Sequence, residues 1–140
     1  MPNRQDVIDE ARSYCGTPYH HQGRVKGAGV DCLGLVIGVA HNLGLSDFDH
    51  QSYSALPSPR VLKSFADQLM ARKQRTDARP GDVALIAWRR VPQHLALITD
   101  LSGGLGLLHA YGEVGCVVEH RLSADWWDAI VGVYAIPGLE

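Results

Sequence analysis

The stretch Gly27-Ala28-Gly29-Val30-Asp31-Cys32-Leu33-Gly34-Leu35 marks the point where a glycine-containing loop gives way to the most apolar helix of the chain. A helix start leaves several backbone N–H groups unpaired and carries a partial positive charge. We expect a thiol placed there to ionise more readily than a free one, and the thiolate is the reactive form. Residues 33–40 have almost no polar face, so the helix should be buried on nearly all sides. The sequence therefore predicts that Cys32 is a nucleophile held on a rigid element.

The composition is typical of one globular domain, which we expect to span residues 1–140. Hydrophobic residues make up 46% and charged residues 20% of the chain, enough for a sizeable core. A net charge of −2 without a dense Lys/Arg stripe argues against nucleic acid as a partner, and the apolar runs are too short for membrane insertion. Three cysteines are too few for a disulfide framework. No apolar segment of a secretory signal follows the N-terminus, so we expect synthesis in the cytoplasm with reduced thiols.

The N-terminal half carries the spacing and end signals of three helices. Asn3 is expected to cap a first helix that ends near Tyr14, and Ser58-Pro59 to open a third helix with the basic tail Arg72-Lys73. Between these two helices the sequence predicts a loop over residues 17–31, the Cys32 helix to about Leu43, and an irregular connection over residues 45–57.

After Pro80 the pattern changes to short apolar segments with strand spacing, separated by turn residues. Five strands are expected, over residues 83–88, 94–99, 105–111, 116–120 and 130–136. Ser123 is expected to cap a single helical turn that carries Trp126-Trp127. Helices followed by a run of closely connected strands indicate an α+β fold, in which the N-terminal helices pack on an antiparallel sheet of about five strands.

Two histidines in the strand half are candidates for the base that a cysteine nucleophile requires. His94 and His109 are separated by 109 − 94 = 15 positions, a hairpin's spacing, so two paired strands can bring the rings side by side. Because side chains alternate between the two faces of a strand, both rings can point toward the helix layer. Cys32, a histidine that takes its proton and a second group that orients this histidine form a nucleophile–base–orienter pattern.

The chain resembles the NlpC/P60 cysteine peptidases in four motifs that occur in the family's order. They are Asp31-Cys32-Leu33-Gly34-Leu35, Arg79-Pro80-Gly81-Asp82-Val83, His94-Leu95-Ala96-Leu97-Ile98 and Leu108-His109-Ala110. The earlier Gly16-Thr17-Pro18-Tyr19 is similar to the family's entry motif, so the resemblance spans nearly the whole chain.

This resemblance implies a papain-like fold and cleavage of peptidoglycan stem peptides, typically between γ-D-glutamate and a diamino acid, without a cofactor. Carried over by motif, Cys32 is the nucleophile, His94 the general base and His109 the third, orienting member. Tyr19 and Asp31 match positions that line the substrate site, where Asp31 faces the free amine of the stem peptide. The Cys32 backbone N–H at the helix start is a natural donor to an oxyanion, and the Tyr19 hydroxyl can assist it.

In its small size the chain resembles the stand-alone members of the family that occur in phage and gene-transfer-agent tails. We therefore expect carriage on a phage-like tail, docking to a hub or tip protein, and action in the periplasm or cell wall. Two alternatives stay open, a structural tail-tip module that no longer cuts and an amidase or acyltransferase on the same fold.

Several other residues have plainer expected roles. Leu33 stands where many relatives have Ser, and the loop before Cys32 carries basic side chains and a histidine pair, which leaves substrate preference open. Cys15 and Cys116 are expected to be small buried hydrophobic residues, and Trp126-Trp127 a plug at the sheet edge. Surface or packing roles are expected for His41, His50 and His120. A less favoured alternative is a zinc site built from His20, His21, Cys32, His94 and His109.

Overall fold

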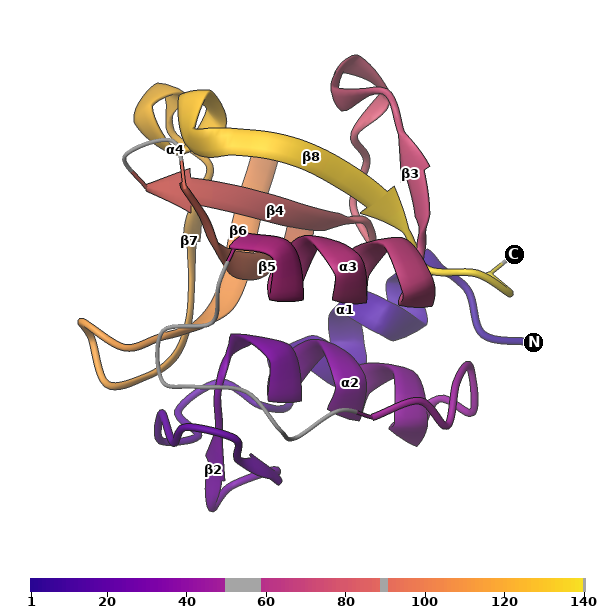
Figure 1. Ribbon diagram of the computed structural model, residues 1–140, viewed down its shortest axis with the longest axis vertical. Helices are drawn as coiled ribbons and strands as arrows, with labels where there is room; N and C mark the ends of the chain where they lie inside the picture. The colour runs from indigo at the N-terminus through magenta and orange to yellow at the C-terminus, as the bar shows by residue number, and fades with distance from the viewer. Residues whose placement is uncertain (50–58, 89–90, 140) are drawn as a thin grey trace.

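The computed structural model describes residues 1–49, 59–88 and 91–139 (Figure 1). The predicted Ser58 cap, His50 and most of the irregular connection lie outside the described residues. The helices are α1 (Arg4–Arg12), α2 (Cys32–Asn42), α3 (Pro59–Leu69), the 3-10 turn η1 (Arg75–Asp77) and α4 (Ala124–Ala129). The strands are β1 (Arg24–Val25), β2 (Gly29–Val30), β3 (Ala71–Lys73), β4 (Val83–Trp88), β5 (Val91–Leu101), β6 (Gly104–Tyr111), β7 (Cys116–Arg121) and β8 (Ile130–Ala135).

The strands β3 to β8 form one antiparallel sheet in the order β3-β8-β4-β5-β6-β7. The predicted α+β fold is thus confirmed, with six strands in place of about five. The additional strand is β3, because Arg72 and Lys73 pair with Tyr134 and Val133 of β8. The prediction that these two basic residues end a helix is therefore wrong. A short hairpin of β1 and β2 forms a separate two-stranded sheet within the expected loop.

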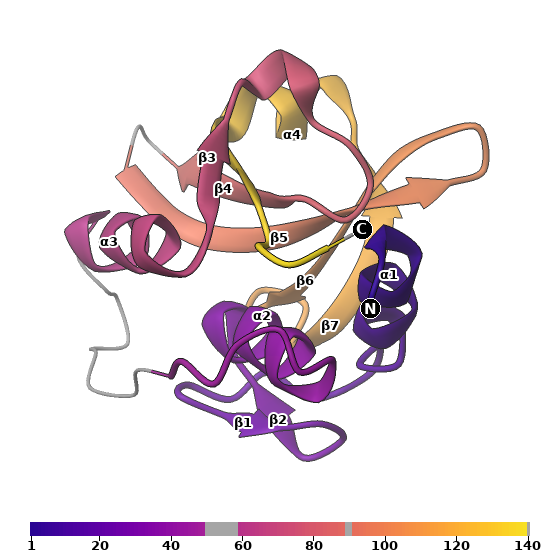
Figure 2. The ribbon, with the colours of Figure 1, turned by 90° about the vertical axis from the view of Figure 1, so that its right-hand side faces the viewer.

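Helices cover both faces of the sheet. The larger core joins buried residues of α1, α2 and α3 to one face of the sheet, through side chains such as Leu85, Leu95 and Leu97. The smaller core lies on the opposite face, where Ile86, Ala96 and other alternate residues pack under α4. Figure 2 shows this arrangement, with α2 and α4 on opposite sides of the strands. The alternation of strand side chains therefore supplies two separate apolar layers.

The start of α1 is capped as predicted. The backbone N–H of Asp6 donates to Asn3 Oδ1, and the N–H of Asn3 donates to Asp6 Oδ2, both at 2.9 Å. This reciprocal capping box satisfies backbone donors that would otherwise lack a partner.

The carboxylate of Asp82, fully buried at the start of β4, ties three separate segments together. It pairs with Arg4 of α1 at 2.7 Å and with Lys73 of β3 at 2.8 Å. The backbone N–H of Arg79 donates to the same carboxylate at 2.8 Å. A buried carboxylate with this many partners is satisfied rather than free for chemistry. The Arg79–Val83 motif is thus explained by structure, since it fixes β4 relative to α1 and β3.

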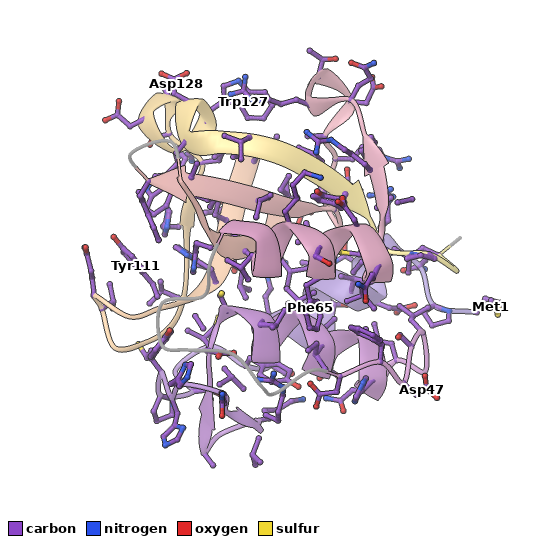
Figure 3. The ribbon with its side chains drawn as sticks, in the orientation of Figure 1. Met1, Asp47, Phe65, Tyr111, Trp127 and Asp128 are labelled. Atoms are coloured by element: carbon purple, nitrogen blue, oxygen red, sulfur yellow. The ribbon has the colours of Figure 1, made fainter. Side chains whose placement is uncertain are left out.

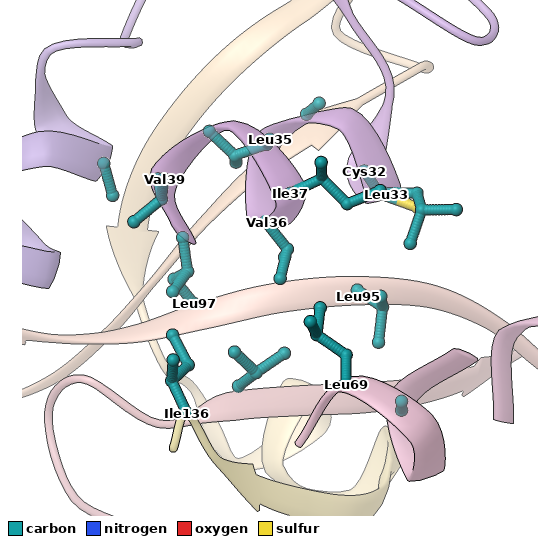
Figure 4. Packing of buried hydrophobic residues seen from close by; sticks show 14 of the residues in the cluster. Cys32, Leu33, Leu35, Val36, Ile37, Val39, Leu69, Leu95, Leu97 and Ile136 are labelled. Carbon is teal, nitrogen blue, oxygen red and sulfur yellow. The ribbon is translucent and has the colours of Figure 1, made fainter. Parts of the chain in front are cut away.

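Helix α2 is buried on nearly all sides, as its composition predicted. Every residue from Cys32 to Ala40 is buried, and Figure 4 shows the helix lying over β5, with Leu95 and Leu97 beneath it. A Cβ on Gly34 would come within 2.0 Å of the carbonyl oxygen of Gly23. Close approach of the preceding loop therefore requires glycine there, and it fixes the loop against the first turn of the helix.

None of the helices in the described part of the chain combines the length and the apolar character needed to cross a bilayer.

Candidate active site

Cys32 is the first residue of α2, and its side chain is 8% exposed. Asp31 caps the helix, because its Oδ1 accepts a hydrogen bond of 2.7 Å from the backbone N–H of Gly34. The N–H groups of Cys32, Leu33 and Leu95 donate toward the Cys32 sulfur. The thiol therefore lies between the N-terminus of α2 and the backbone of β5 at Leu95, the residue that follows His94.

Burial dominates the electrostatics of the Cys32 thiol. It raises the pKa of Cys32 to about 12, and the negative charge of Asp31 acts in the same direction. Hydrogen bonds from the backbone N–H groups of Leu95, Leu33 and Cys32 itself lower the pKa, but they do not outweigh burial. The expectation that the helix start makes Cys32 more acidic is therefore wrong for the free protein, in which the thiol is neutral.

His94 and His109 are in direct contact, as the 15-residue spacing predicted. Nε2 of His94 lies 2.5 Å from Nδ1 of His109, and both side chains are buried. Burial lowers the pKa of His94 well below 6.5, with a further contribution from His109. Burial likewise lowers the pKa of His109 to about 3, helped by His120. Both rings are thus neutral at physiological pH, and a neutral imidazole can accept a proton.

The histidines lie on the face of the sheet covered by α4, so the prediction that they point toward the N-terminal helices is wrong. His94 pairs across the ladder with Ile86, and His120 pairs with Leu107. Both Ile86 and Leu107 belong to the core under α4. The reason is strand alternation, because Leu95 occupies the face of β5 beneath α2.

Strands β5 and β6 stop pairing near the cysteine. In the described residues their ladder runs from Leu101↔Gly104 to Leu97↔Leu108, although β5 begins at Val91 and β6 ends at Tyr111. The backbone N–H of Leu95 lies in this unpaired stretch and donates to the Cys32 sulfur. The thiol thus approaches the backbone of β5 in the stretch where β5 and β6 no longer pair.

Aromatic rings enclose the two histidines. Trp88 stacks on His94 with ring centroids 5.1 Å apart, and Tyr111 stacks on His109 at the same separation. Trp126 meets His109 edge to face at 5.3 Å. Figure 3 shows Tyr111 at the end of β6. These contacts exclude water from the rings and restrict their rotation.

Trp126-Trp127 is partly buried against the core under α4, in agreement with the predicted packing role. Trp127 stacks under the guanidinium of Arg75, 4.4 Å from the ring centroid. Trp126 has a second role that the sequence did not indicate, since it contacts the histidines.

His120 contacts the predicted pair of histidines, which the sequence analysis did not anticipate. Its half-buried ring packs against Trp126, in agreement with a packing role, and its Nε2 lies 2.8 Å from Nε2 of His109. The signal was available in the hairpin, because His109 pairs with Val118, and His120 is the diagonal neighbour on the same face. Recognising it required the register of β6 and β7, which hydrophobic pattern alone does not specify.

The carboxylate of Asp31 is engaged on both oxygens. Besides capping α2, it accepts from the backbone N–H of Gln22 at 2.8 Å and pairs with Arg24 at 3.3 Å. The ring of His21 is 4.0 Å away. Asp31 is therefore part of the structure that holds the loop before Cys32, and its role toward a substrate amine stays a prediction.

Tyr19 lies beside the cysteine, with 37% of its surface exposed. Its pKa is raised to about 12, first by burial and then by the charges of Cys32 and Asp31. The backbone N–H of Tyr19 donates to the carbonyl of Gly115 at 2.8 Å, which fixes this segment on the β6–β7 hairpin. The phenol therefore keeps its proton at neutral pH and is available as a donor.

The remaining cysteines and histidines lie apart from this constellation. Cys15 is exposed and Cys116 half-buried, so the expectation that both are buried is wrong. His41 is exposed at the far end of α2, in agreement with a surface role, and His20 is exposed in the loop. Within the described ranges, no three side chains of His, Cys, Asp or Glu are grouped so that they could hold a metal ion.

No protein-family model matches the sequence, and no curated protein matches it. Several solved structures are similar to this chain. The NlpC/P60 domain of the peptidoglycan hydrolase SagA is 22% identical with a TM-score of 0.64, and the match covers 96% of this chain and 99% of that one. The peptidoglycan hydrolase RipB from Mycobacterium tuberculosis is 24% identical with a TM-score of 0.61, over 95% of this chain and 64% of that one.

An NlpC/P60 family protein from Bacillus cereus is 18% identical with a TM-score of 0.68, over 94% of this chain and 39% of that one. This chain therefore spans well under half of the Bacillus protein. At such identities the similarity establishes the fold alone. The chain has the fold of NlpC/P60 domains.

Proposed function

We propose that this protein is a cysteine peptidase that hydrolyses the peptide stems of peptidoglycan. The observation that carries the proposal is the contact of 2.5 Å between His94 and His109. The buried thiol at the start of α2 receives the backbone N–H of Leu95, the residue that follows His94. A nucleophile, a base and a group that orients the base are the three parts of this chemistry. The fold agrees, because SagA and RipB are peptidoglycan hydrolases by name.

In the proposed reaction the thiol and the imidazole start neutral. Burial keeps the pKa of Cys32 high and that of His94 low, so no thiolate–imidazolium pair exists before substrate binds. Cys32 attacks the amide carbonyl while His94 takes the thiol proton, and His94 then gives this proton to the leaving amine. Water hydrolyses the thioester that remains. A neutral resting state protects the thiol from oxidation, because the thiolate is the form that reacts.

The oxyanion of the tetrahedral intermediate has donors at the helix start. The N–H groups of Cys32 and Leu33 face the sulfur, while the N–H of Gly34 is engaged by Asp31. The pKa of Tyr19 is raised to about 12, first by burial and then by Cys32 and Asp31, so its hydroxyl keeps its proton at neutral pH. We assign the Cys32 N–H and the Tyr19 hydroxyl to the oxyanion. The negative charge of Asp31 is suited to attract the ammonium group of a stem peptide.

The test is incubation of the protein with purified peptidoglycan, followed by mass analysis of the released fragments. The wild type should release fragments cut between γ-D-glutamate and the diamino acid, and Cys32→Ala should release none. Cys15→Ala is the matched control, because this exposed thiol lies outside the site, and it should cut like the wild type. Equal release by wild type and Cys32→Ala would exclude the proposal.

The same fragments separate the two rivals. A structural module would release nothing in any variant, whereas an amidase or acyltransferase would give products of other masses. Carriage on a phage-like tail stays a prediction from the resemblance, and detection of this chain in purified particles is its test.

A further inference from the structure

We propose that His120 is a positioning residue that fixes the protonation pattern of the other two histidines, so that His94 offers its free nitrogen to Cys32. This inference rests on the proposed function, since it concerns how the base of that reaction is prepared. It adds a fourth side chain to the three that the sequence predicted.

At the outer end of the three contacting histidines, His120 has a partner that can only accept a hydrogen bond. Nδ1 of His120 lies 3.0 Å from the backbone carbonyl oxygen of Arg121. A carbonyl oxygen has no proton to give, so the hydrogen of this bond belongs to Nδ1 of His120. When His120 is neutral its ring carries a single N–H, and Nε2 is then a hydrogen-bond acceptor.

This assignment passes inward through two further contacts. Because Nε2 of His120 accepts, Nε2 of His109, at 2.8 Å, must be the donor. Nδ1 of His109 then has a free lone pair, and Nε2 of His94, at 2.5 Å, donates to it. Nδ1 of His94 is thus left without a proton. The carbonyl of Arg121 determines which nitrogen of the base is free, through three rings in series.

Packing holds the three rings in the geometry that this ordering requires. His94 and His109 meet at an interplanar angle of 64°, and His109 and His120 at 66°, so each ring directs an edge nitrogen at the next. Trp126 lies 5.3 Å from His109 and 5.2 Å from His120, bridging the two. His109 is fully buried, so solvent cannot replace His120 as its acceptor. An unpaired N–H there would be costly.

The energetic consequence concerns the base. If the ordering were reversed, Nδ1 of His94 would carry the proton and could not receive another from the thiol. The two bonds between imidazoles can form in either direction, so the bond from His120 to the carbonyl oxygen of Arg121 is the one that favours the productive pattern. When His94 becomes an imidazolium, its Nε2–H already points at the lone pair of His109, so no group has to reorient.

The test uses two substitutions that differ in one property. His120→Phe keeps an aromatic ring against Trp126 but offers no acceptor. In His120→Gln, the side-chain oxygen can accept the Nε2–H of His109. We expect His120→Phe to lower kcat about tenfold with little change in KM, the effect of one lost hydrogen bond. His120→Gln should stay within about twofold of the wild type, because a single acceptor is restored. His41→Phe, a histidine at the far end of α2, is the control and should leave kcat unchanged.

Nuclear magnetic resonance of the imidazole nitrogens provides a second measurement that needs no substrate. In the wild type the proton should reside on Nδ1 of His120 and on Nε2 of both His109 and His94. In His120→Phe, His109 and His94 should show a mixture of the two forms. A wild-type His109 with its proton on Nδ1 would overturn the proposal, even in an active enzyme. Equal kcat losses in His120→Phe and His120→Gln, or no loss in either, would also overturn it.

These readouts keep the two proposals distinct. If the wild type cuts no peptidoglycan but its histidines show the expected protonation, the proposed function fails and the role of His120 stands. If cleavage occurs and the protonation pattern is the reverse, the opposite conclusion holds.

Discussion

The cysteine and the histidines are held in place by different means on opposite faces of one sheet. Cys32 is positioned by backbone, through the cap at Asp31, the helix it begins and the N–H of Leu95. His94 is positioned by side chains, through His109 and a stacked Trp88. The position of Cys32 therefore changes only if α2 moves. The position of His94 depends on each of the rings that contact it.

The difference teaches where sequence change is tolerated. Helix α2 behind Cys32 packs in a close-packed apolar core, so substitutions on that helix should act mainly on stability. The surroundings of His94 are aromatic and polar, so substitutions there should act mainly on the chemistry. Four predictions test this division, and the largest effect is expected at the base.

His94→Ala should lower kcat for peptidoglycan cleavage by about 10⁴-fold, because the thiol loses the group that takes its proton. Stability should change far less than activity. The measurement is fragment release over time, with thermal unfolding of the same samples. His41→Ala is the matched control, because it removes an exposed imidazole at the other end of α2. Retention of a tenth of the activity by His94→Ala would assign the base elsewhere.

On the other face, Gly34→Ala should destabilise the protein by about 3 kcal/mol. The new Cβ would lie 2.0 Å from the carbonyl oxygen of Gly23, and this backbone atom cannot move without moving the loop. Activity per folded molecule should also fall, because the same loop carries Tyr19. Denaturant unfolding measures the first effect and fragment release the second.

Gly38→Ala provides the comparison, since its Cβ would meet a side chain instead of backbone. The nearest atom is the hydroxyl oxygen of Tyr14, at 2.3 Å. Tyr14→Phe removes this atom, so the double variant should recover part of the loss. No comparable rescue exists for Gly34. Equal stability of Gly34→Ala and wild type would mean that the loop adjusts freely.

The contrast between the faces also explains how much of the molecule the sequence could predict. The helix start at Cys32 and the limits of β4, β6 and β8 follow from local signals, namely caps, glycines and apolar spacing. The contact between His94 and His109 follows from hairpin spacing. Such features depend on residues that are near one another in sequence.

What the sequence could not predict depends on non-local packing. The face on which His94 lies follows from which side of β5 is taken by Leu95, and the role of His120 from the register of β7. The raised pKa of Cys32 follows from burial, which competes with the helix start and outweighs it. A local argument predicted the contact between His94 and His109, but it could not balance these opposing effects.

The third prediction is that the stability of the protein depends on pH. It tests the face of the sheet that carries the histidines, because these are the groups that titrate. Unfolded histidine takes up protons near pH 6.5, whereas buried His109, with its pKa lowered to about 3, does not. The unfolded state therefore binds more protons below pH 6.5, and stability falls as the pH falls. Between pH 7 and pH 5, His109 alone should account for a loss of about 2 kcal/mol, and His94 adds to it in the same direction.

Denaturant unfolding at several pH values checks this dependence. In His109→Gln the loss should be smaller, since one of the two rings that must stay neutral is gone. A stability that is independent of pH between 7 and 5 would show that the rings accept protons in the folded state.

The smallest effect is expected where the two arrangements meet, at Asp31. Asn is as good a helix cap as Asp, so Asp31→Asn should keep the bond to Gly34 and cost about 1 kcal/mol or less, through the weakened pairing with Arg24. If the charge attracts the substrate amine, cleavage of a stem peptide with a free amine should fall about tenfold. The same peptide with an acetylated amine should be cut as before or faster, because loss of the Asp31 charge lowers the pKa of Cys32. Equal losses on both peptides would mean that Asp31 only holds the loop, and no loss on either would exclude a role in recognition.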